Sequence, residues 1–425
     1  MLRSGFSFIL LLLLTTFTPS APASEPQWSR FRGPNGLGVA TDTDIPVKFS
    51  ERSVLWKKAI PGSGNSSPVL WGNRIFLQSA SKDGKERMLL CLSSLDGKII
   101  WNKSFPTSPG LKPKTHPKNS LASATPAVDG ERVYALFWDG VDMQLFGLDM
   151  EGKQLWQRNL GPVKSQHGPG TSPMVYQKKV YVANDQDGEA ELLAFDALTG
   201  KDVWRAKRQP FRACYSVPFL LEKPEMPTEL IVGSTAGLTS YDPDTGHENW
   251  NWTTWPFAKM ALRTVASPLA TDGMIIANSG DGSGERNTVA IRPQGKGTLS
   301  NEVVLWSKIK SYPYVPNLLA LGEHLYFVND GGFAGCAVAR TGEILWLERL
   351  GGNFSASPIL IDGKVYAASE EGTVYVFQAA PKFQLLAKNV LDEGIIATPA
   401  VAGHRLFIRG RNSLYCFGDV STSAR

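Results

Sequence analysis

Short apolar runs separated by tight turns recur along the chain in one fixed order, with a period of roughly 40 to 60 residues. Each unit begins with a brief apolar run and a two-residue turn, such as Gly72-Asn73 or Asp362-Gly363. A second run is β-branched or aromatic, a third ends in a glycine turn, and a fourth carries a tryptophan. Runs of this kind are typical of strands joined by hairpins. The pattern therefore predicts repeated four-stranded antiparallel units.

A small residue followed by proline marks the start of each unit. Proline has no N–H to donate, so within a sheet it belongs at the first residue of a strand or on an edge strand. The innermost strand of a propeller blade is such an edge. The dipeptides are Ser67-Pro68, Thr125-Pro126, Ser172-Pro173, Val217-Pro218, Ser267-Pro268, Val315-Pro316, Ser357-Pro358 and Thr398-Pro399. They predict an all-β fold, an eight-bladed β-propeller of four-stranded antiparallel blades.

The two ends of the repeat predict how the ring closes. The last unit runs out of apolar sequence at Gly418, before a fourth strand. Residues 54–58 have the fourth-strand pattern but precede every unit. We therefore expect this N-terminal strand to complete the last blade, which removes an open sheet edge. Two units depart from the pattern: a longer segment, residues 292–304, precedes Trp306, and Leu386 stands where a tryptophan is expected.

The tryptophans of the fourth strands are predicted to be structural. Each blade needs a neighbour to cover its face, and a large ring near the outer rim fills the wedge between two blades. The residues in this position are Trp56, Trp101, Trp156, Trp204, Trp250, Trp306 and Trp346.

The N-terminus has the features of a targeting segment. Arg3 precedes an apolar run at residues 8–14, and small residues follow up to Ala23. The run is shorter than the 20 or so residues that span a bilayer. We expect residues 1–23 to be a signal peptide, with an uncleaved anchor as the alternative. Residues 24–50 then form a Gly/Pro-containing lead-in arm, residues 51–418 the propeller, and residues 419–425 a tail.

Composition and cysteine spacing exclude several classes of function. The chain has 44 Lys and Arg against 39 Asp and Glu, with no basic block, so nucleic acid is not an expected partner. No membrane span is expected after signal cleavage. Cys91, Cys214, Cys336 and Cys416 lack CxxC spacing and are interpreted as small buried side chains rather than metal or redox pairs.

The mouth of the central funnel is the candidate ligand site. Its lining is expected from the segments that precede each innermost strand, and Arg, Tyr and His gathered there suit an anionic ligand. We expect Arg212 and Arg263 to converge on one pocket. The alternative is that these residues only cap strand ends. The candidates are Asn65, His116, His167, Arg212, Tyr215, Arg263, Tyr314 and Asn353. No catalytic or metal-ligating residue is identified.

Two weaker motifs leave alternatives open. Residues 185–189 resemble the start of a calcium loop but lack the distal Glu, and an acidic hairpin tip explains them as well. Trp138, Trp252 and Trp255 are candidates for carbohydrate binding if they lie together on one exposed surface.

Residues 194–204 match Ala-x-Asp-x-x-Thr-Gly-x-x-x-Trp at every fixed position, and residues 240–250 at all but the first. This resembles the tryptophan-docking motif of eight-bladed quinoprotein propellers, over about residues 51–418. The chain is similar to exported bacterial pyrroloquinoline-quinone-like β-propeller repeat proteins. That family is related in fold to the propeller lipoprotein of outer-membrane assembly and to quinoprotein dehydrogenases.

The resemblance implies two different functions. We expect a non-catalytic binding or scaffold propeller of the bacterial cell envelope, monomeric and located in the periplasm or outside the cell. Its funnel mouth and inter-blade loops would bind an envelope protein or a small ligand, and no cofactor is expected.

The alternative is a pyrroloquinoline-quinone-dependent oxidoreductase with Ca²⁺, acting on an alcohol or sugar. The resemblance then implies adjacent cysteines, a tryptophan floor and a calcium ion held by carboxylates and an Asn. No two cysteines are adjacent here. A carboxylate, an Asn and an Arg inside the funnel would favour this alternative.

Overall fold

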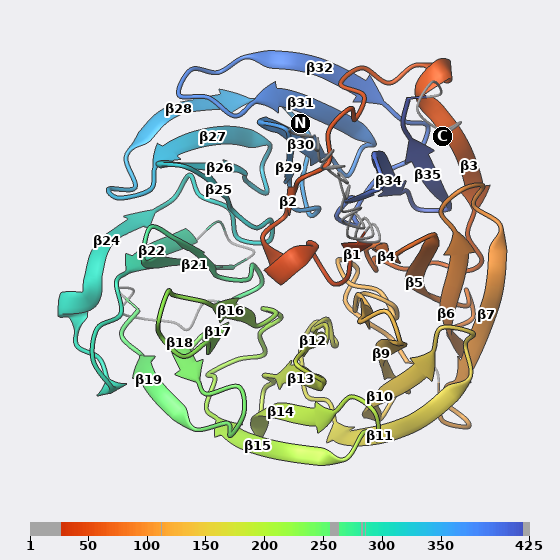
Figure 1. Cartoon of the computed structure of the whole chain (residues 1–425), viewed down its shortest axis with the longest axis horizontal. Coiled ribbons are helices and arrows are strands. Elements are labelled where there is room, and N and C mark those ends of the chain that lie inside the picture. Colours follow the sequence, from red (N-terminus) through yellow and green to blue (C-terminus); the bar gives the residue numbers. More distant parts are fainter. Residues whose placement is uncertain (1–26, 112, 256–262, 282–283, 285, 420–425) are drawn as a thin grey trace, which may run out of the picture.

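The computed structural model describes residues 27–111, 113–255, 263–281, 284 and 286–419, and it shows eight antiparallel blades arranged in a ring (Figure 1). The predicted fold class is confirmed. Blades 1 to 4 contain β4 (Val69–Trp71), β5 (Arg74–Ala80), β6 (Glu86–Ser93), β7 (Ile99–Pro106); β8 (Ala127–Val128), β9 (Arg132–Trp138), β10 (Asp142–Asp149), β11 (Gln154–Pro162); β12 (Met174–Tyr176), β13 (Lys179–Asn184), β14 (Ala190–Asp196), β15 (Asp202–Arg208); and β16 (Phe219–Leu221), β17 (Glu229–Ser234), β18 (Gly237–Tyr241), β19 (Glu248–Trp252).

The second half of the ring repeats this order from the inner strand to the outer one. Blades 5 to 8 contain β20 (Leu269–Thr271), β21 (Met274–Gly280), β22 (Arg286–Ile291), β24 (Val304–Ile309); β25 (Leu319–Leu321), β26 (His324–Val328), β27 (Phe333–Val338), β28 (Ile344–Arg349); β29 (Ile359–Ile361), β30 (Lys364–Ala368), β31 (Thr373–Gln378), β32 (Leu385–Val390); and β33 (Ala400–Ala402), β34 (Arg405–Arg409), β35 (Ser413–Phe417), β3 (Val54–Ala59).

The predicted closure strand is confirmed. β3 pairs antiparallel with β35, with Trp56 opposite Cys416, and it supplies the outer strand of blade 8. The short 3₁₀ helix η2 (Glu51–Ser53) leads directly into this strand. The N-terminal strand is therefore held by backbone hydrogen bonds to the last strand of the chain within blade 8, and the outer edge of β35 is covered.

The inter-blade surfaces form the core. Apolar clusters lie between adjacent blades, because each sheet buries its face against the next. Six tryptophans of the outer strands donate Nε1–H to a backbone carbonyl of the following blade. These bonds run from Trp56 to Ser94 (3.1 Å), Trp101 to Met150 (2.9 Å), Trp156 to Ala197 (3.1 Å), Trp204 to Pro243 (3.0 Å), Trp306 to Ala339 (2.9 Å) and Trp346 to Ala380 (3.0 Å).

The small residue at each blade start has a structural reason. Its hydroxyl accepts the backbone N–H of the equivalent residue in the preceding blade, so the bonds run head to tail around the channel. Ser67 N–H donates to Thr125, Thr125 to Ser172, Val217 to Ser267, Asn317 to Ser357, Ser357 to Thr398, and Thr398 back to Ser67, at 2.9 to 3.1 Å. We call this set the hydroxyl ladder. It has two gaps. Between blades 3 and 4, Val217 has no hydroxyl to accept the N–H of Ser172. Between blades 5 and 6, Asn317 has no hydroxyl either, and its side-chain amide donates to the carbonyl of Ser267 at 3.2 Å.

Two sequence predictions about individual positions are wrong. Blade 6 begins at Asn317 rather than at Val315-Pro316, because β25 starts two residues later than that proline implies. The residue opposite Val376 in blade 7 is Ala387, so Leu386 does not occupy the tryptophan position. Trp250 packs in an apolar cluster with Ile275 and Ile291 of blade 5, but its Nε1–H donates to Oε2 of Glu229 in its own blade at 2.6 Å. The longer segment before Trp306 adds β23 (Gly297–Thr298) to the edge of β19.

Phe49 supplies the aromatic ring that the outer strand of blade 7 lacks. Its backbone N–H donates to Oδ1 of Asn389 in β32 at 2.8 Å. Its side chain stacks on Phe417 of β35 with ring centroids 4.2 Å apart. The segment before β3 thus fills the junction between blades 7 and 8.

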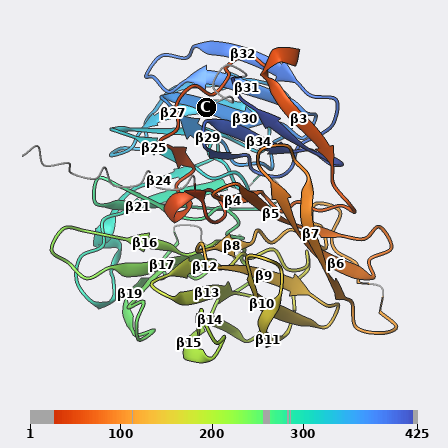
Figure 2. The ribbon, with the colours of Figure 1, turned by 45° about the vertical axis from the view of Figure 1, so that its right-hand side comes forward.

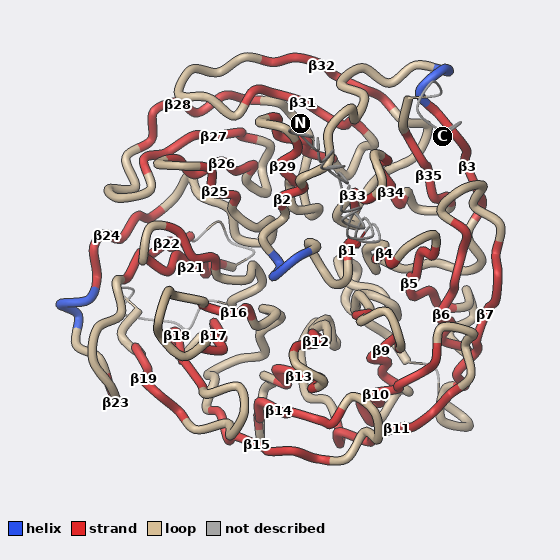
Figure 3. Tube along the Cα trace, in the orientation of Figure 1, coloured by secondary structure: helices blue, strands red, loops and turns tan. Residues whose placement is uncertain are grey.

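The described part of the lead-in arm enters the central channel. β1 (Gln27–Trp28) pairs with β4 of blade 1, and β2 (Val39–Ala40) pairs with β29 of blade 7. Between them the 3₁₀ helix η1 (Pro34–Gly36) lies at the centre of the ring, as the single blue segment there in Figure 3 and the turned view in Figure 2 show. We call residues 27–40 the plug.

Buried polar side chains hold the plug against several blades. Arg30 donates to the carbonyl of Pro218 at 2.5 Å, and Arg32 to that of Leu318 at 2.9 Å. The amide of Asn35 pairs with both the N–H and the C=O of Leu220, each at 2.8 Å, as a neighbouring strand would. Burial lowers the pKa of both guanidinium groups to about 9. The plug therefore satisfies inner-strand edges that would otherwise face the open channel.

The predicted signal peptide at residues 1–23 lies outside the described residues, as does the tail beyond Asp419. In the part of the chain that is described, no helix has the length and apolar character needed to cross a bilayer.

Candidate functional site

One face of the ring carries the candidate site. The loops that connect the outer strand of one blade to the inner strand of the next all reach this face, and they surround a cavity of about 830 Å³. Phe31 from the plug also lines it, as do five of the ladder residues, Ser67, Thr125, Ser172, Ser357 and Thr398. All eight residues singled out from the sequence lie on its wall: Asn65, His116, His167, Arg212, Tyr215, Arg263, Tyr314 and Asn353. Binding of a ligand to them stays a prediction.

A second set of lining residues was not predicted from the sequence. Asp281, Asp330 and Glu370 come from the turns between the second and third strands of blades 5, 6 and 7. In an antiparallel blade every second connection returns to the same face, so these turns point toward the cavity as the inter-blade loops do. The number of strands that precede each turn was the available signal, because it decides which face the turn reaches. That number can be counted only if the strand boundaries are known to within about one residue.

Two guanidinium groups converge on one amide oxygen, as the sequence predicts for Arg212 and Arg263. Arg263 donates to Oε1 of Gln166 at 2.8 Å, and Arg212 donates to the same atom at 3.3 Å. Arg263 is 3 % exposed and also donates to the carbonyl of Ala213. Gln166 was not foreseen, because an uncharged side chain in a loop has no distinctive pattern. The pair forms a donor-rich corner that suits a carboxylate or another oxyanion.

The acidic segment at residues 185–189 positions this corner and does not form a calcium loop. Asp185 is 7 % exposed and is held by Arg208 through two contacts of 2.7 and 3.0 Å. Asp187 accepts the N–H of Ala213 at 2.7 Å and that of Gln166 at 3.3 Å. Both carboxylates therefore fix the loops that carry Gln166 and Arg212.

Two histidines lie beside the same corner. The rings of His116 and His167 have centroids 4.3 Å apart. Burial, together with the nearby charge of Arg263, lowers the pKa of His167 to about 4. The Nδ1 atom of His167 is buried and has no hydrogen-bond partner among the described residues. His167 is therefore neutral at physiological pH and does not add charge to the corner.

The charged groups on the opposite wall are mostly engaged with one another. Arg286 lies 3.5 Å from Oδ2 of Asp330 and stacks over the ring of Tyr314 at 5.1 Å. Asp330 also accepts the N–H groups of Tyr314 and Val315, at 2.8 and 3.1 Å. Burial raises the pKa of the Tyr314 hydroxyl above its ordinary value. Glu370 accepts the hydroxyl of Ser355 at 2.5 Å.

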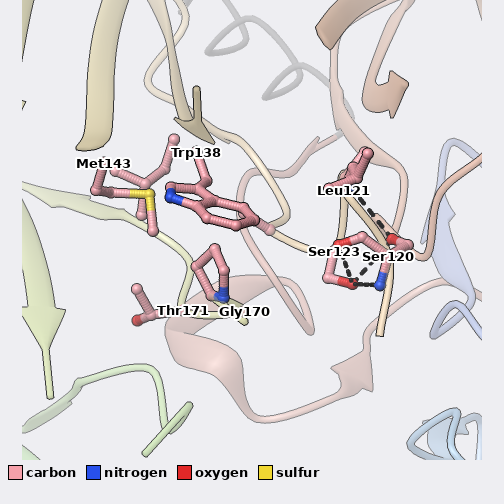
Figure 4. Close-up of a pocket in the computed structure, with 11 residues that line it drawn as sticks. Ser120, Leu121, Ser123, Trp138, Met143, Gly170 and Thr171 are labelled. Atoms are coloured by element: carbon pink, nitrogen blue, oxygen red, sulfur yellow. Dashed lines mark hydrogen bonds between the residues drawn. The ribbon is translucent and has the colours of Figure 1, made fainter. Parts of the chain in front are cut away.

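The carbohydrate interpretation of the three tryptophans is wrong. Trp252 and Trp255 are 0 and 8 % exposed and pack edge to face, with centroids 5.6 Å apart. Trp138 lines a separate cavity of about 10 Å³ with Met143 and Thr171, beside the bonded pair Ser120 and Ser123 (Figure 4). The three rings therefore do not share an exposed surface.

The cysteines are buried and lie apart, as the sequence predicts. All four are free, and burial raises the pKa of the thiols to about 12 for Cys91, Cys214 and Cys416 and to about 11 for Cys336. In the described residues no three His, Cys, Asp or Glu side chains gather as a metal site would require. No tryptophan of the described residues lines the large cavity.

A protein-family model described as "Outer membrane protein assembly factor BamB" matches residues 37–162 and 144–380. No curated protein matches the chain.

Solved structures share the architecture. A europium-containing methanol dehydrogenase has a TM-score of 0.65 at 12 % identity, over 92 % of this chain and 98 % of its own. BamB from Moraxella catarrhalis has a TM-score of 0.56 at 13 % identity, over 89 % of this chain and 100 % of its own. The quinohemoprotein alcohol dehydrogenase from Comamonas testosteroni has a TM-score of 0.64 at 13 % identity, over 92 % of this chain and 80 % of its own. Likeness at these identities shows the fold alone.

Proposed function

The chain belongs to the propeller family whose model is described as "Outer membrane protein assembly factor BamB", and from this premise we propose a non-catalytic binding protein of the bacterial cell envelope. It holds an anionic small ligand in the central cavity, and its inter-blade loops present that site to an envelope partner. No cofactor takes part. The predicted targeting segment at residues 1–23 and the family support export to the periplasm or beyond.

One observation carries the proposal. Arg212 and Arg263 share a single neutral acceptor, Oε1 of Gln166, on the wall of an 830 Å³ cavity. Two guanidinium groups aimed at one point favour an oxyanion there, because charge-assisted hydrogen bonds are about twice as strong as neutral ones. The volume lies within the range of about 300 to 1,000 Å³ that is usual for small-molecule sites.

The test uses citrate as the probe anion, with thermal unfolding and calorimetric titration as readouts. A ligand of the native state stabilises it by about 2.7 kcal/mol at 100 times its Kd, so the thermal midpoint rises with citrate. The rise is expected to vanish in Arg263→Gln and to shrink in Arg212→Gln. Arg205→Gln on outer strand β15 is the matched control and keeps the full shift, since its partners Asp202 and Glu191 lie away from the cavity. Equal shifts in all three variants would contradict the site.

The oxidoreductase remains the second candidate, and one observation favours it. The cavity wall contains carboxylates, asparagines and arginines, among them Asp330, Asn317 and Arg286. The fit to quinone and Ca²⁺ is nevertheless poor. Asp330 is already bound to Arg286 and two backbone N–H groups, and the described residues supply neither a cluster of ligating carboxylates nor a tryptophan floor.

A titration with pyrroloquinoline quinone and Ca²⁺ separates the two candidates. We expect no saturable change in tryptophan fluorescence and no rise in the thermal midpoint at high micromolar quinone. Saturable binding with a raised midpoint would reverse the choice and call for a substrate screen with an electron-accepting dye.

A further inference from the structure

The cavity wall contains a buried cation and an anion that form no ion pair with any of the described residues. The Lys, Arg, Asp and Glu side chains on the wall include Arg286, which pairs with Asp330, and Arg212 and Asp281, which make interactions of their own. Lys118 is exposed. Setting these aside identifies the charges that are available to a ligand.

Arg263 is the available cation. It is 3 % exposed, and its hydrogen-bond partners among the described residues are two neutral oxygens, on Gln166 and Ala213. Within the described residues it takes part in no ion pair. A buried charge is normally paired, because leaving it without a counter-charge is costly. A carboxylate from a ligand would provide the missing partner.

Glu370 is the available anion. It projects from the turn between β30 and β31, and its side chain accepts one hydrogen bond, from Ser355. No Lys, Arg or His of the described residues forms an ion pair with it. Arg263 precedes blade 5 and Glu370 belongs to blade 7, so the two charges lie on different sectors of one wall.

We propose that the cavity binds an amphoteric ligand, a short peptide with free termini, whose carboxylate meets Arg263 and Arg212 and whose ammonium meets Glu370. The inference rests on the proposed anion site and adds the second charge. A purely anionic ligand would leave Glu370 unpaired and facing a negative molecule. The cavity volume leaves room for several residues, and the ladder hydroxyls Ser67, Thr125 and Thr398 face its interior.

The test compares three probes: trialanine, N-acetyl-trialanine, which lacks the ammonium, and trialanine amide, which lacks the carboxylate. Calorimetry on the wild-type chain is expected to show trialanine binding, with acetylation and amidation each weakening it about 10- to 100-fold. Because the ligand is altered rather than the protein, a folding defect cannot imitate this result.

Protein variants assign each loss to its residue. The effect of acetylation should disappear in Glu370→Gln, and that of amidation in Arg263→Gln. Glu343→Gln is the matched control, on the β27–β28 turn at the other face, and it should retain both effects. Should Arg263→Gln fail to fold, Arg212→Gln reports on the same carboxylate.

The outcomes separate this inference from the proposed function. Equal binding of trialanine and its acetylated form overturns the amphoteric ligand while the anion site stands. The same holds if citrate binds and trialanine does not bind at millimolar concentration. If neither citrate nor trialanine binds, both proposals are wrong.

Discussion

At the scale of single residues, the repeat is a set of contacts between a bulky ring and a small partner. Ala194, Cys91, Cys336 and Cys416 each lie opposite a tryptophan in the sheet register. The turn glycine of the next blade lies under the same indole: a Cβ on Gly200 would be 2.5 Å from the Trp156 ring. The motif therefore contains the residues that pack against the tryptophan both in its own blade and in the next one. This is why the motif predicts the fold so well.

Replacing Trp204 by Ala should destabilise the protein by about 3 to 5 kcal/mol, as large aromatic truncations in cores do. The indole is 9 % exposed, donates to Pro243 and covers Gly246 of the next blade. The measurement is the urea midpoint at an unchanged m-value. Leu198→Ala, in the turn of the same blade and 60 % exposed, is the control and should stay within about 0.5 kcal/mol. An unaltered midpoint for the tryptophan variant would rule this role out.

The pKa of His167 predicts a pH dependence of stability. It is lowered from 6.5 to about 4, so the unfolded chain binds a proton that the folded chain rejects over this interval. The contribution of neutral His167 to the free energy of unfolding is fully present above pH 6.5 and is lost as the pH falls toward 4. His167→Asn should flatten the curve of thermal midpoint against pH in this window, whereas the exposed His247→Asn should not. Parallel curves for wild type and His167→Asn would contradict the assignment.

Residue identity alone did not reveal the whole site. The eight wall residues followed from their place before the inner strands, because chain direction fixes which face those loops reach. Gln166 and Glu370 were missed for different reasons. The amide of Gln166 becomes significant only when two guanidinium groups meet at it, and Glu370 lies in a turn whose face depends on counting strands without error.

At the scale of elements, the outer strand of blade 8 and the plug act on different edges. β3 covers the outer edge of β35, whereas β1 and β2 cover inner edges. The closure strand was predictable because a missing fourth strand and a surplus one are both visible in the repeat. The course of the plug was not, because residues 27–40 make polar contacts with distant carbonyls and have no periodicity.

Truncation separates these two elements. A chain that begins at residue 45 should fold as a monomer of reduced stability, since it keeps β3 and loses the plug. A chain that begins at residue 60 also loses β3 and should aggregate, because an exposed long edge strand pairs with other molecules. Size-exclusion chromatography and urea unfolding against the chain from residue 24 provide the measurement. Monomeric behaviour of the shorter chain would show that closure is dispensable.

At the scale of the whole molecule, the hydroxyl ladder joins blades that the chain connects only through long loops. Its gap at Val217 offers a gain-of-stability test. Val217→Thr places a hydroxyl where Ser172 can donate to it, and one added hydrogen bond is worth about 0.5 to 1.5 kcal/mol. Val232→Thr, buried within β17, is the control and should destabilise because its hydroxyl would be buried in an apolar cluster. A loss of stability in Val217→Thr measured by urea unfolding would contradict the ladder.

The plug connects blades through the centre of the ring, in addition to the contacts that each blade makes with its neighbours. Its backbone and side chains reach β4, Val128, Pro218, Leu318 and β29, which belong to blades 1, 2, 4, 6 and 7. A protease nick in a loop between two blades would therefore leave both fragments attached to one centre as well as to their neighbours. Two halves expressed separately, divided at such a loop, should reassemble around the fragment that carries residues 27–40.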